Sequence, residues 1–151
     1  MQIIDLVKEF CQRAGLGEIV FDPAQGARLT MNETTLAIEA MPDTILLTAS
    51  LGPVPDGADV DLFRTLLIAN FELAETGGAS LALNATFDEI MVCRTILQAD
   101  LPYEAFEREI SIFVTIAEAW APKLRRGSIR DDAPEGGSGL ESDPDAVQIR
   151  A

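Results

Sequence analysis

The 151-residue chain contains no histidine, only two cysteines, and 11 basic residues against 25 acidic ones. Without histidine, the usual general base for a serine or cysteine nucleophile is missing. No stretch approaches the roughly 18 uninterrupted apolar residues that a membrane-spanning helix requires. The N-terminal segment MQIIDLVKEF carries Asp5 and Glu9 where a signal peptide would be basic and then apolar. These features predict a cytoplasmic protein.

The excess of acidic over basic residues lies in residues 1–120, which hold 6 basic and 19 acidic side chains. This segment therefore carries almost all of the net charge of -14. Affinity for nucleic acid depends on Lys and Arg that neutralise phosphates, and anionic lipid headgroups repel an acidic surface for the same reason. We therefore expect neither a nucleic acid nor a membrane as partner.

Catalytic and metal-binding motifs are also missing at diagnostic spacing. Cys11 and Cys93 lie in apolar contexts without a CxxC pattern, which favours two buried small hydrophobes over a zinc or redox pair. The acidic pairs at 59/61 and 131/132 are more typical of helix caps and solvated surface than of a cation site. Gly77-Gly78 follows a helix instead of preceding one, which disfavours a phosphate loop. We expect no cofactor, no metal and no enzymatic activity.

What the sequence does contain is a single domain of alternating helical and strand-like segments, for which half apolar content in 151 residues suffices. Apolar residues in 3–14 recur at helical spacing, and Gly15 is a plausible C-terminal stop. Short alternating runs between turn signals then predict three antiparallel strands at 27–31, 34–40 and 43–50. The prolines and glycine of LGPVPDGAD should end this part of the sheet.

Alternation places one set of apolar side chains on a single face of these strands, where a helix must cover them. The set is Leu29, Met31, Leu36, Ile38, Ala40, Ile45, Leu47 and Ala49.

The helix expected at 60–74, with Asp59 as its N-cap, is apolar around most of its circumference. Such a helix must be buried on more than one side. The sheet can cover one side, and in a domain this small a second molecule is the favoured cover for the other. The alternative is that it is simply a central core helix.

The rest of the chain completes an α+β fold of order α-βββ-α-ββ-α. Gly77 is the expected left-handed C-cap of the second helix, and a hairpin of ASLALN with EIMVCRTIL follows, joined by a loop at 85–88. The last helix should begin near Pro102 and end or kink at Pro122. We therefore predict a domain at 1–122 and a flexible polar tail at 123–151, which has too few large apolar residues to offset the entropy of ordering.

The segments LLIANFELAETGGASLALNATFDEIMVCRTIL and LPYEAFEREISIFVTIAEAW resemble the class I type III secretion chaperones, the family of the Tir and CesT-like effector chaperones. The resemblance covers about residues 1–120 and consists of apolar patterns more than of a diagnostic signature. It implies a homodimer with an antiparallel twisted sheet packed by helices. It also implies that the dimer binds the N-terminal region of a secreted effector in extended form and keeps it secretion-competent without ATP hydrolysis.

The resemblance further implies positions for both kinds of contact. The dimer interface would comprise Leu62, Leu66, Leu67, Asn70 and Phe71 on the second helix with Leu81 and Leu83 on the next strand. Effector-binding candidates are Ile4, Val7, Leu29, Met31, Leu36 and Ile38. The simpler alternative is that each of these apolar side chains belongs to the core.

Three functions are compatible with this sequence. The leading one is an effector chaperone. The second is a regulatory protein of the same fold that sequesters a transcriptional regulator or antiactivator, and the third is a generic protein-binding module. The sequence does not separate them, because they differ only in the identity of the partner.

Overall fold

The computed structural model describes residues 2–17, 19–22 and 26–126. It contains, in chain order, α1 (Ile3–Ala14), β1 (Ala27–Met31), β2 (Thr34–Ala40), β3 (Thr44–Pro53), α2 (Val60–Glu72), β4 (Ser80–Asn84), β5 (Glu89–Leu97) and α3 (Tyr103–Arg125). The predicted tail at 123–151 lies mostly outside the described residues.

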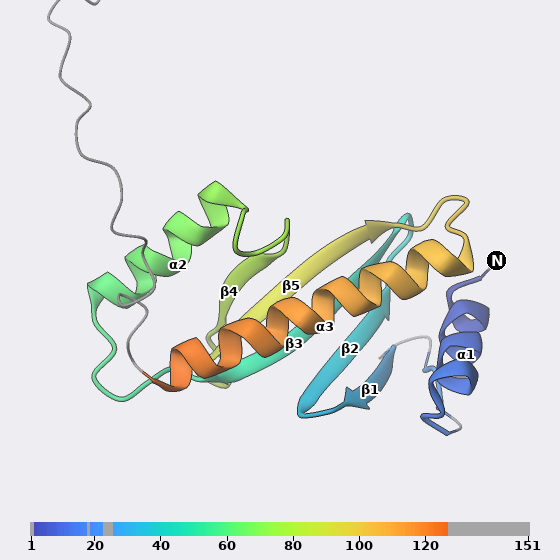
Figure 1. Cartoon of the computed structure of the whole chain (residues 1–151), viewed down its shortest axis with the longest axis horizontal. Helices are drawn as coiled ribbons and strands as arrows, with labels where there is room; N and C mark the ends of the chain where they lie inside the picture. Colours follow the sequence, from blue (N-terminus) through green and yellow to red (C-terminus); the bar gives the residue numbers. More distant parts are fainter. Residues whose placement is uncertain (1, 18, 23–25, 127–151) are drawn as a thin grey trace, which may run out of the picture.

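The five strands form one antiparallel sheet in the order β1-β2-β3-β5-β4. Helix α3 runs along one face of this sheet, while α1 lies at its β1 end and α2 at its β4 end (Figure 1). The predicted α+β class and element order are confirmed.

The core lies between this face of the sheet and α3. Strand alternation brings Leu29, Leu36 and Ile45 to the covered face, and each is fully buried. Helix α3 contributes a matching apolar side, on which Phe106, Phe113 and Trp120 are buried. Helix α1 extends this layer with Leu6, Val7, Phe10 and Cys11.

Two of the predicted helix caps are confirmed and one is wrong. Gly15 adopts a left-handed conformation (φ 68°) after α1, and the Asp59 side chain accepts a hydrogen bond from the Leu62 N–H at 3.1 Å. Helix α2, however, ends at Glu72 and its C-cap is Leu73, not the predicted Gly77. Leu73 itself takes the left-handed conformation (φ 60°), and its N–H bonds to the Ala69 carbonyl.

Two proline-based boundaries lie further along the chain than predicted. Strand β3 continues to Pro53, because a bulge between Ser50 and Gly52 (φ 127°) absorbs the irregularity and the proline occupies the last position of the strand. Of the two alternatives predicted for Pro122, an end or a kink, the end is wrong, because α3 continues to Arg125. Tertiary contacts hold its last turn in place: Leu124 is 2% exposed and Lys123 pairs with Glu75 at 3.3 Å.

Candidate protein-binding surfaces

Helix α2 buries only one of its apolar sides within the chain. Leu66 and Ala69 pack into the core at 6% and 7% exposure. On the other side Leu67 is 67% exposed and Phe71 is 88% exposed. A shallow pocket of about 460 Å³ lies on this side, lined by Val60, Phe63, Arg64, Leu67, Ile68 and Phe71. We call these six residues the α2 surface. Contiguous apolar patches of this kind mark interaction sites.

The residues predicted for a dimer interface divide into two groups. Leu67, Phe71 and Leu83 are exposed, and Leu62 is partly buried. Leu66 and Leu81 are core residues, each 6% exposed. The single-chain structure therefore leaves the exposed group available to a partner, together with Val60 and Ile68, which were absent from the predicted interface.

Asn70, also predicted at the interface, has partners within its own chain. Its side-chain oxygen accepts from the Leu81 N–H at 2.7 Å, and its amide nitrogen donates to the Leu81 carbonyl at 2.9 Å. These bonds attach α2 to the outer side of β4. The sequence pattern marked Asn70 only as a polar residue in an apolar helix.

The residues predicted to bind an effector are mostly core. Leu29, Leu36 and Ile38 are fully buried, and Val7 is 1% exposed. They lie on the covered face of the sheet and the inner side of α1, so a partner cannot reach them in this conformation. Ile4 and Met31 are partly exposed and remain candidates for contact.

A second open surface lies beside α1. The sequence pattern indicated almost none of the residues that line it. A groove of about 740 Å³ runs between α1 and the segment that follows it, lined by Lys8, Cys11, Gln12, Gly15, Gly17, Ile19 and Val20. We call it the α1 groove. Val20 is 86% exposed, and Ile19 packs against the edge of the core. The signal in the sequence was the pair Ile19-Val20 before a turn, which is too short to distinguish a strand from an exposed apolar site.

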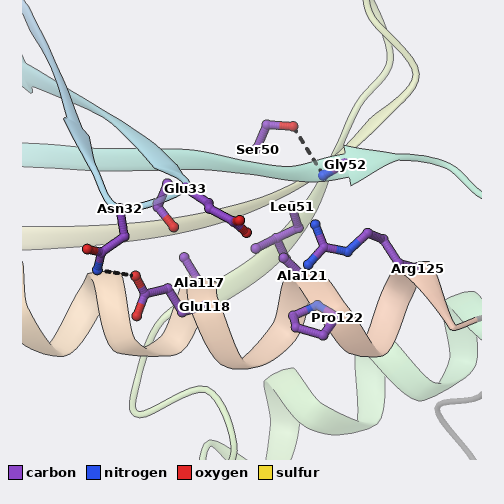
Figure 2. Close-up of a pocket in the computed structure, with 11 residues that line it drawn as sticks. Asn32, Glu33, Ser50, Leu51, Gly52, Ala117, Glu118, Ala121, Pro122 and Arg125 are labelled. Carbon is purple, nitrogen blue, oxygen red and sulfur yellow. Dashed lines mark hydrogen bonds between the residues drawn. The ribbon is translucent and has the colours of Figure 1, made fainter.

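A third hollow, of about 460 Å³, has a polar rim and lies between the β1–β2 turn, the end of β3 and the last turns of α3 (Figure 2). On one side Asn32 donates a hydrogen bond to Glu118 at 2.8 Å. Leu51 lines the middle, and the Arg125 guanidinium points into the hollow from the opposite side (Figure 2). The rim carries both signs of charge and so lacks the apolar character of the other two surfaces.

The two thiols of the chain are shifted away from reactivity. Burial raises the pKa of both the Cys11 and Cys93 thiols, which makes them poorer nucleophiles at neutral pH. Among the residues that the structure describes, no cluster of three or more His, Cys, Asp or Glu side chains could hold a metal ion. In the same residues, no helix combines the length and the apolar content needed to cross a membrane.

An α+β domain with exposed apolar surfaces has the properties of a protein-binding class, and comparisons with known proteins identify that class. The model of the Tir chaperone protein (CesT) family matches residues 5–121. A Chlamydia pneumoniae protein is 30% identical over 126 residues, which cover 81% of this chain and 95% of that protein.

Solved structures agree with this match. The ExsC–ExsE complex contains a chain of 27% identity with a TM-score of 0.66, covering 80% of this chain and 91% of that one. The HopA1–SchA chaperone–effector complex matches at 17% identity with a TM-score of 0.65, covering 79% and 92%, and this second likeness concerns the fold alone. The chain belongs to the Tir chaperone (CesT) family and is a type III secretion chaperone.

Proposed function

We propose that this chain acts in the cytoplasm as a homodimer that binds the N-terminal region of a secreted effector in extended form, without ATP hydrolysis. The proposal rests on two open surfaces that carry exposed apolar residues in a member of this family. Helices α2 and α1, which carry the α2 surface and one side of the α1 groove, lie at opposite ends of the sheet (Figure 1). One surface can therefore serve self-association while the other holds a client.

The α2 surface is the proposed dimer interface. A two-fold interface uses the same patch on both copies, so the patch must complement itself. Packing α2 against its counterpart would cover Leu67, Ile68 and Phe71, which together with Val60 are the large apolar side chains that the single chain leaves exposed on this helix.

The α1 groove is the proposed client contact, extended by the partly exposed Ile4 and Met31. Apolar pockets along a groove accept the side chains of an extended segment, and main-chain hydrogen bonds add affinity that does not depend on sequence. The net charge of -14 favours client segments with basic residues and keeps the apolar surfaces from associating indiscriminately.

The test is to purify the full chain from its native cells under gentle conditions, identify co-eluting protein by mass spectrometry, and determine the particle mass by light scattering. We expect a dimer with a larger protein whose N-terminal segment is shielded from limited proteolysis. Val20→Asp should reduce the recovered client, because it places a charge in the groove at a residue that is 86% exposed and contributes little to folding.

Leu97→Asp is the matched control, since Leu97 is 74% exposed and lies outside both surfaces. Equal recovery with the two variants would exclude the α1 groove as the client site. A particle without a protein partner would contradict the chaperone proposal, and one that holds a DNA-binding regulator would favour the regulatory function.

A further inference from the structure

Helix α2 has little apolar contact with the rest of its own chain. Among its 13 residues, Leu66 and Ala69 are the ones that are buried, and the first of these is the single large one. A helix of this length is marginal in water without tertiary packing. Helix α2 nevertheless carries the α2 surface at the β4 end of the sheet (Figure 1). Its position must therefore depend on further contacts.

One of these contacts joins α2 directly to the sheet. Asn70 exchanges two hydrogen bonds with the backbone of Leu81, at 2.7 and 2.9 Å. Asn70 and the two buried residues of α2 all lie within little more than one helical turn. Together they fix where α2 touches the sheet, and they leave its direction to the segments at its ends.

The segment that follows α2, residues 73–79, is held by both α3 and β5, and we call it the α2–β4 turn. The Trp120 indole N–H of α3 donates to the Glu75 carbonyl at 3.1 Å. Two residues further along the turn, the Gly77 carbonyl accepts a hydrogen bond from Nη1 of Arg94 in β5. Two backbone carbonyls of the turn are thus bound by side chains from two different elements.

The α2–β4 turn also lies close against α3. Thr76 is fully buried, and a Cβ added at Gly77 would lie only 3.0 Å from Cδ1 of Ile116. In addition, Lys123 Nζ lies 3.3 Å from the Glu75 carboxylate. The turn therefore cannot shift without breaking hydrogen bonds or meeting α3, and the end of α2 that leads into it is fixed relative to α3.

Arg94 connects this turn to both the sheet and α3. Its Nε and Nη2 each lie 2.8 Å from one carboxylate oxygen of Glu109, which leaves Nη1 for the Gly77 carbonyl. The side chain is 18% exposed. A planar guanidinium presents several donors in a fixed fork, so it can hold both partners at once with little loss of entropy.

We infer that Arg94 and Trp120 are positioning residues for the α2 surface: by holding the α2–β4 turn, they set the direction in which α2 presents Leu67 and Phe71 to a second copy of the chain. This inference deepens the proposed function and rests on it for the identity of the partner. Neither Arg94 nor Trp120 lines the α2 surface, so their effect on self-association acts through the turn.

Hydrogen exchange followed by NMR tests this positioning within a single chain. The measurement uses the Leu67→Arg chain, in which a charge on the α2 surface opposes self-association. Adding Arg94→Met removes the contact with Gly77 and keeps the apolar stem of the side chain. The α2 amides should then exchange about tenfold faster relative to the amides of β2, because α2 opens locally while the sheet stays closed.

Two variants separate the turn contact from a general loss of stability. Arg13→Met is the matched control, because it removes a guanidinium that packs on Tyr103 of α3 at the α1 end, 4.1 Å from the ring centre. Glu109→Gln keeps an acceptor for Arg94 and leaves the Gly77 contact in place. Both should leave the ratio of α2 to β2 exchange unchanged. An unchanged ratio in Arg94→Met, or an equal change in Arg13→Met, would overturn the inference.

A second measurement connects the position of α2 to self-association. In a chain with an unaltered α2 surface, Arg94→Met should raise the dimer dissociation constant about tenfold, because both copies must hold α2 in place and a competent fraction of about one third in each has this effect. Arg13→Met should leave this constant unchanged even where it lowers the free energy of unfolding. Sedimentation over a concentration series measures the constant, and an unchanged value in Arg94→Met would contradict the proposed role.

Two milder variants serve if Arg94→Met fails to fold. Trp120→Phe removes the N–H that bonds to Glu75 and keeps a large ring, and Arg94→Lys keeps a charge beside Glu109 but lacks the fork that holds two partners. Each should change the exchange ratio in the same direction. The exchange experiment does not require a dimer, so its failure is distinct from the finding of a monomeric wild-type chain, which would contradict the proposed function instead.

Discussion

Arg94 shows how a single residue can join three elements of this fold. It lies on the covered face of β5, where alternation would place an apolar residue. Its Nε donates to Glu109 of α3 at 2.8 Å, and its Nη1 donates to the Gly77 carbonyl in the turn before β4. The contacts satisfy a largely buried guanidinium and fix the α2–β4 turn beneath α3. No sequence pattern predicts them, because Gly77 and Glu109 are both distant from Arg94 in the chain.

Tyr103 occupies a similar junction at the start of α3. Its ring is 5% exposed, the Arg13 guanidinium of α1 lies 4.1 Å from the ring centre, and its hydroxyl is 3.2 Å from Glu107. Burial first, and then the hydrogen bond and charge of Glu107, raise the pKa of Tyr103 above the ordinary value of 10.0.

This raised pKa predicts a loss of stability at alkaline pH. The folded chain holds the phenol proton more tightly than the unfolded chain, so the stabilisation is complete below the ordinary pKa and is lost as pH rises through the folded value. Tyr103 is the chain's single tyrosine, so its ionisation can be followed by absorbance. We expect titration above 10.0 in the native protein and near 10.0 in urea.

Tyr103→Phe supplies the control, because it retains the ring and removes the titrating group. Its unfolding free energy, measured by urea denaturation, should fall less than that of the wild type as pH rises past the ordinary tyrosine pKa. Native-state titration at or below 10.0 would contradict this account.

At the scale of elements, periodicity predicted most of the fold. Strands β1 and β2 have the predicted bounds, because a Pro/Gly-containing or Asn-containing turn limits each of them. Alternation did not show which apolar residues a partner could reach. Alternation correctly placed Leu29 and Ile38 on a face that a helix covers, whereas the family resemblance named the same two residues as effector contacts, which their full burial does not allow in this conformation.

Helix α2 is the element for which periodicity was most informative about function. It predicted burial on two sides, and the structure shows one side packed on the sheet and the other exposed. The exposed side could not be chosen from the sequence, because Leu66 and Leu67 are adjacent leucines that differ only in their direction around the helix.

The two leucines give a matched test of the proposed dimer. Leu67→Arg should leave the fold intact and convert a particle of twice 16.3 kDa to a monomer, since it places an unpaired charge in the interface at a residue that is 67% exposed in the single chain. Light scattering measures the mass, and circular dichroism verifies folding. Leu66→Arg should instead unfold the chain, because Leu66 is only 6% exposed.

Leu97→Arg controls for the added charge, because Leu97 is exposed but lies outside the α2 surface. It should keep the wild-type mass. A Leu67→Arg variant that remains a stable dimer would remove the α2 surface from the interface.

At the scale of the whole molecule, composition alone limits the class of partner. A strongly acidic domain favours protein over nucleic acid as partner, because affinity for nucleic acid depends on Lys and Arg. Composition could not locate the surfaces. The α1 groove forms where α1 meets a segment that has no regular secondary structure, and such segments carry no periodic signal.

The end of the folded domain is the remaining prediction at this scale. Composition placed it at Pro122, but the core includes Leu124, which is 2% exposed. In addition, Lys123 lies 4.9 Å from the centre of the Trp120 ring and pairs with Glu75. The last turn of α3 therefore contributes to stability, and the folded unit should extend to about residue 126.

Two truncations distinguish these boundaries. A chain ending at Arg126 should unfold at the same temperature as the full chain, because it keeps every residue of the described core. A chain ending at Pro122 loses the burial of Leu124 and both contacts of Lys123, at a cost of about 2 to 5 kcal/mol, which should lower Tm by roughly 6 °C or more. Equal Tm values for the two truncations would support a domain boundary at Pro122. A Tm for the chain ending at Arg126 that is well below that of the full chain would show that residues beyond 126 stabilise the domain.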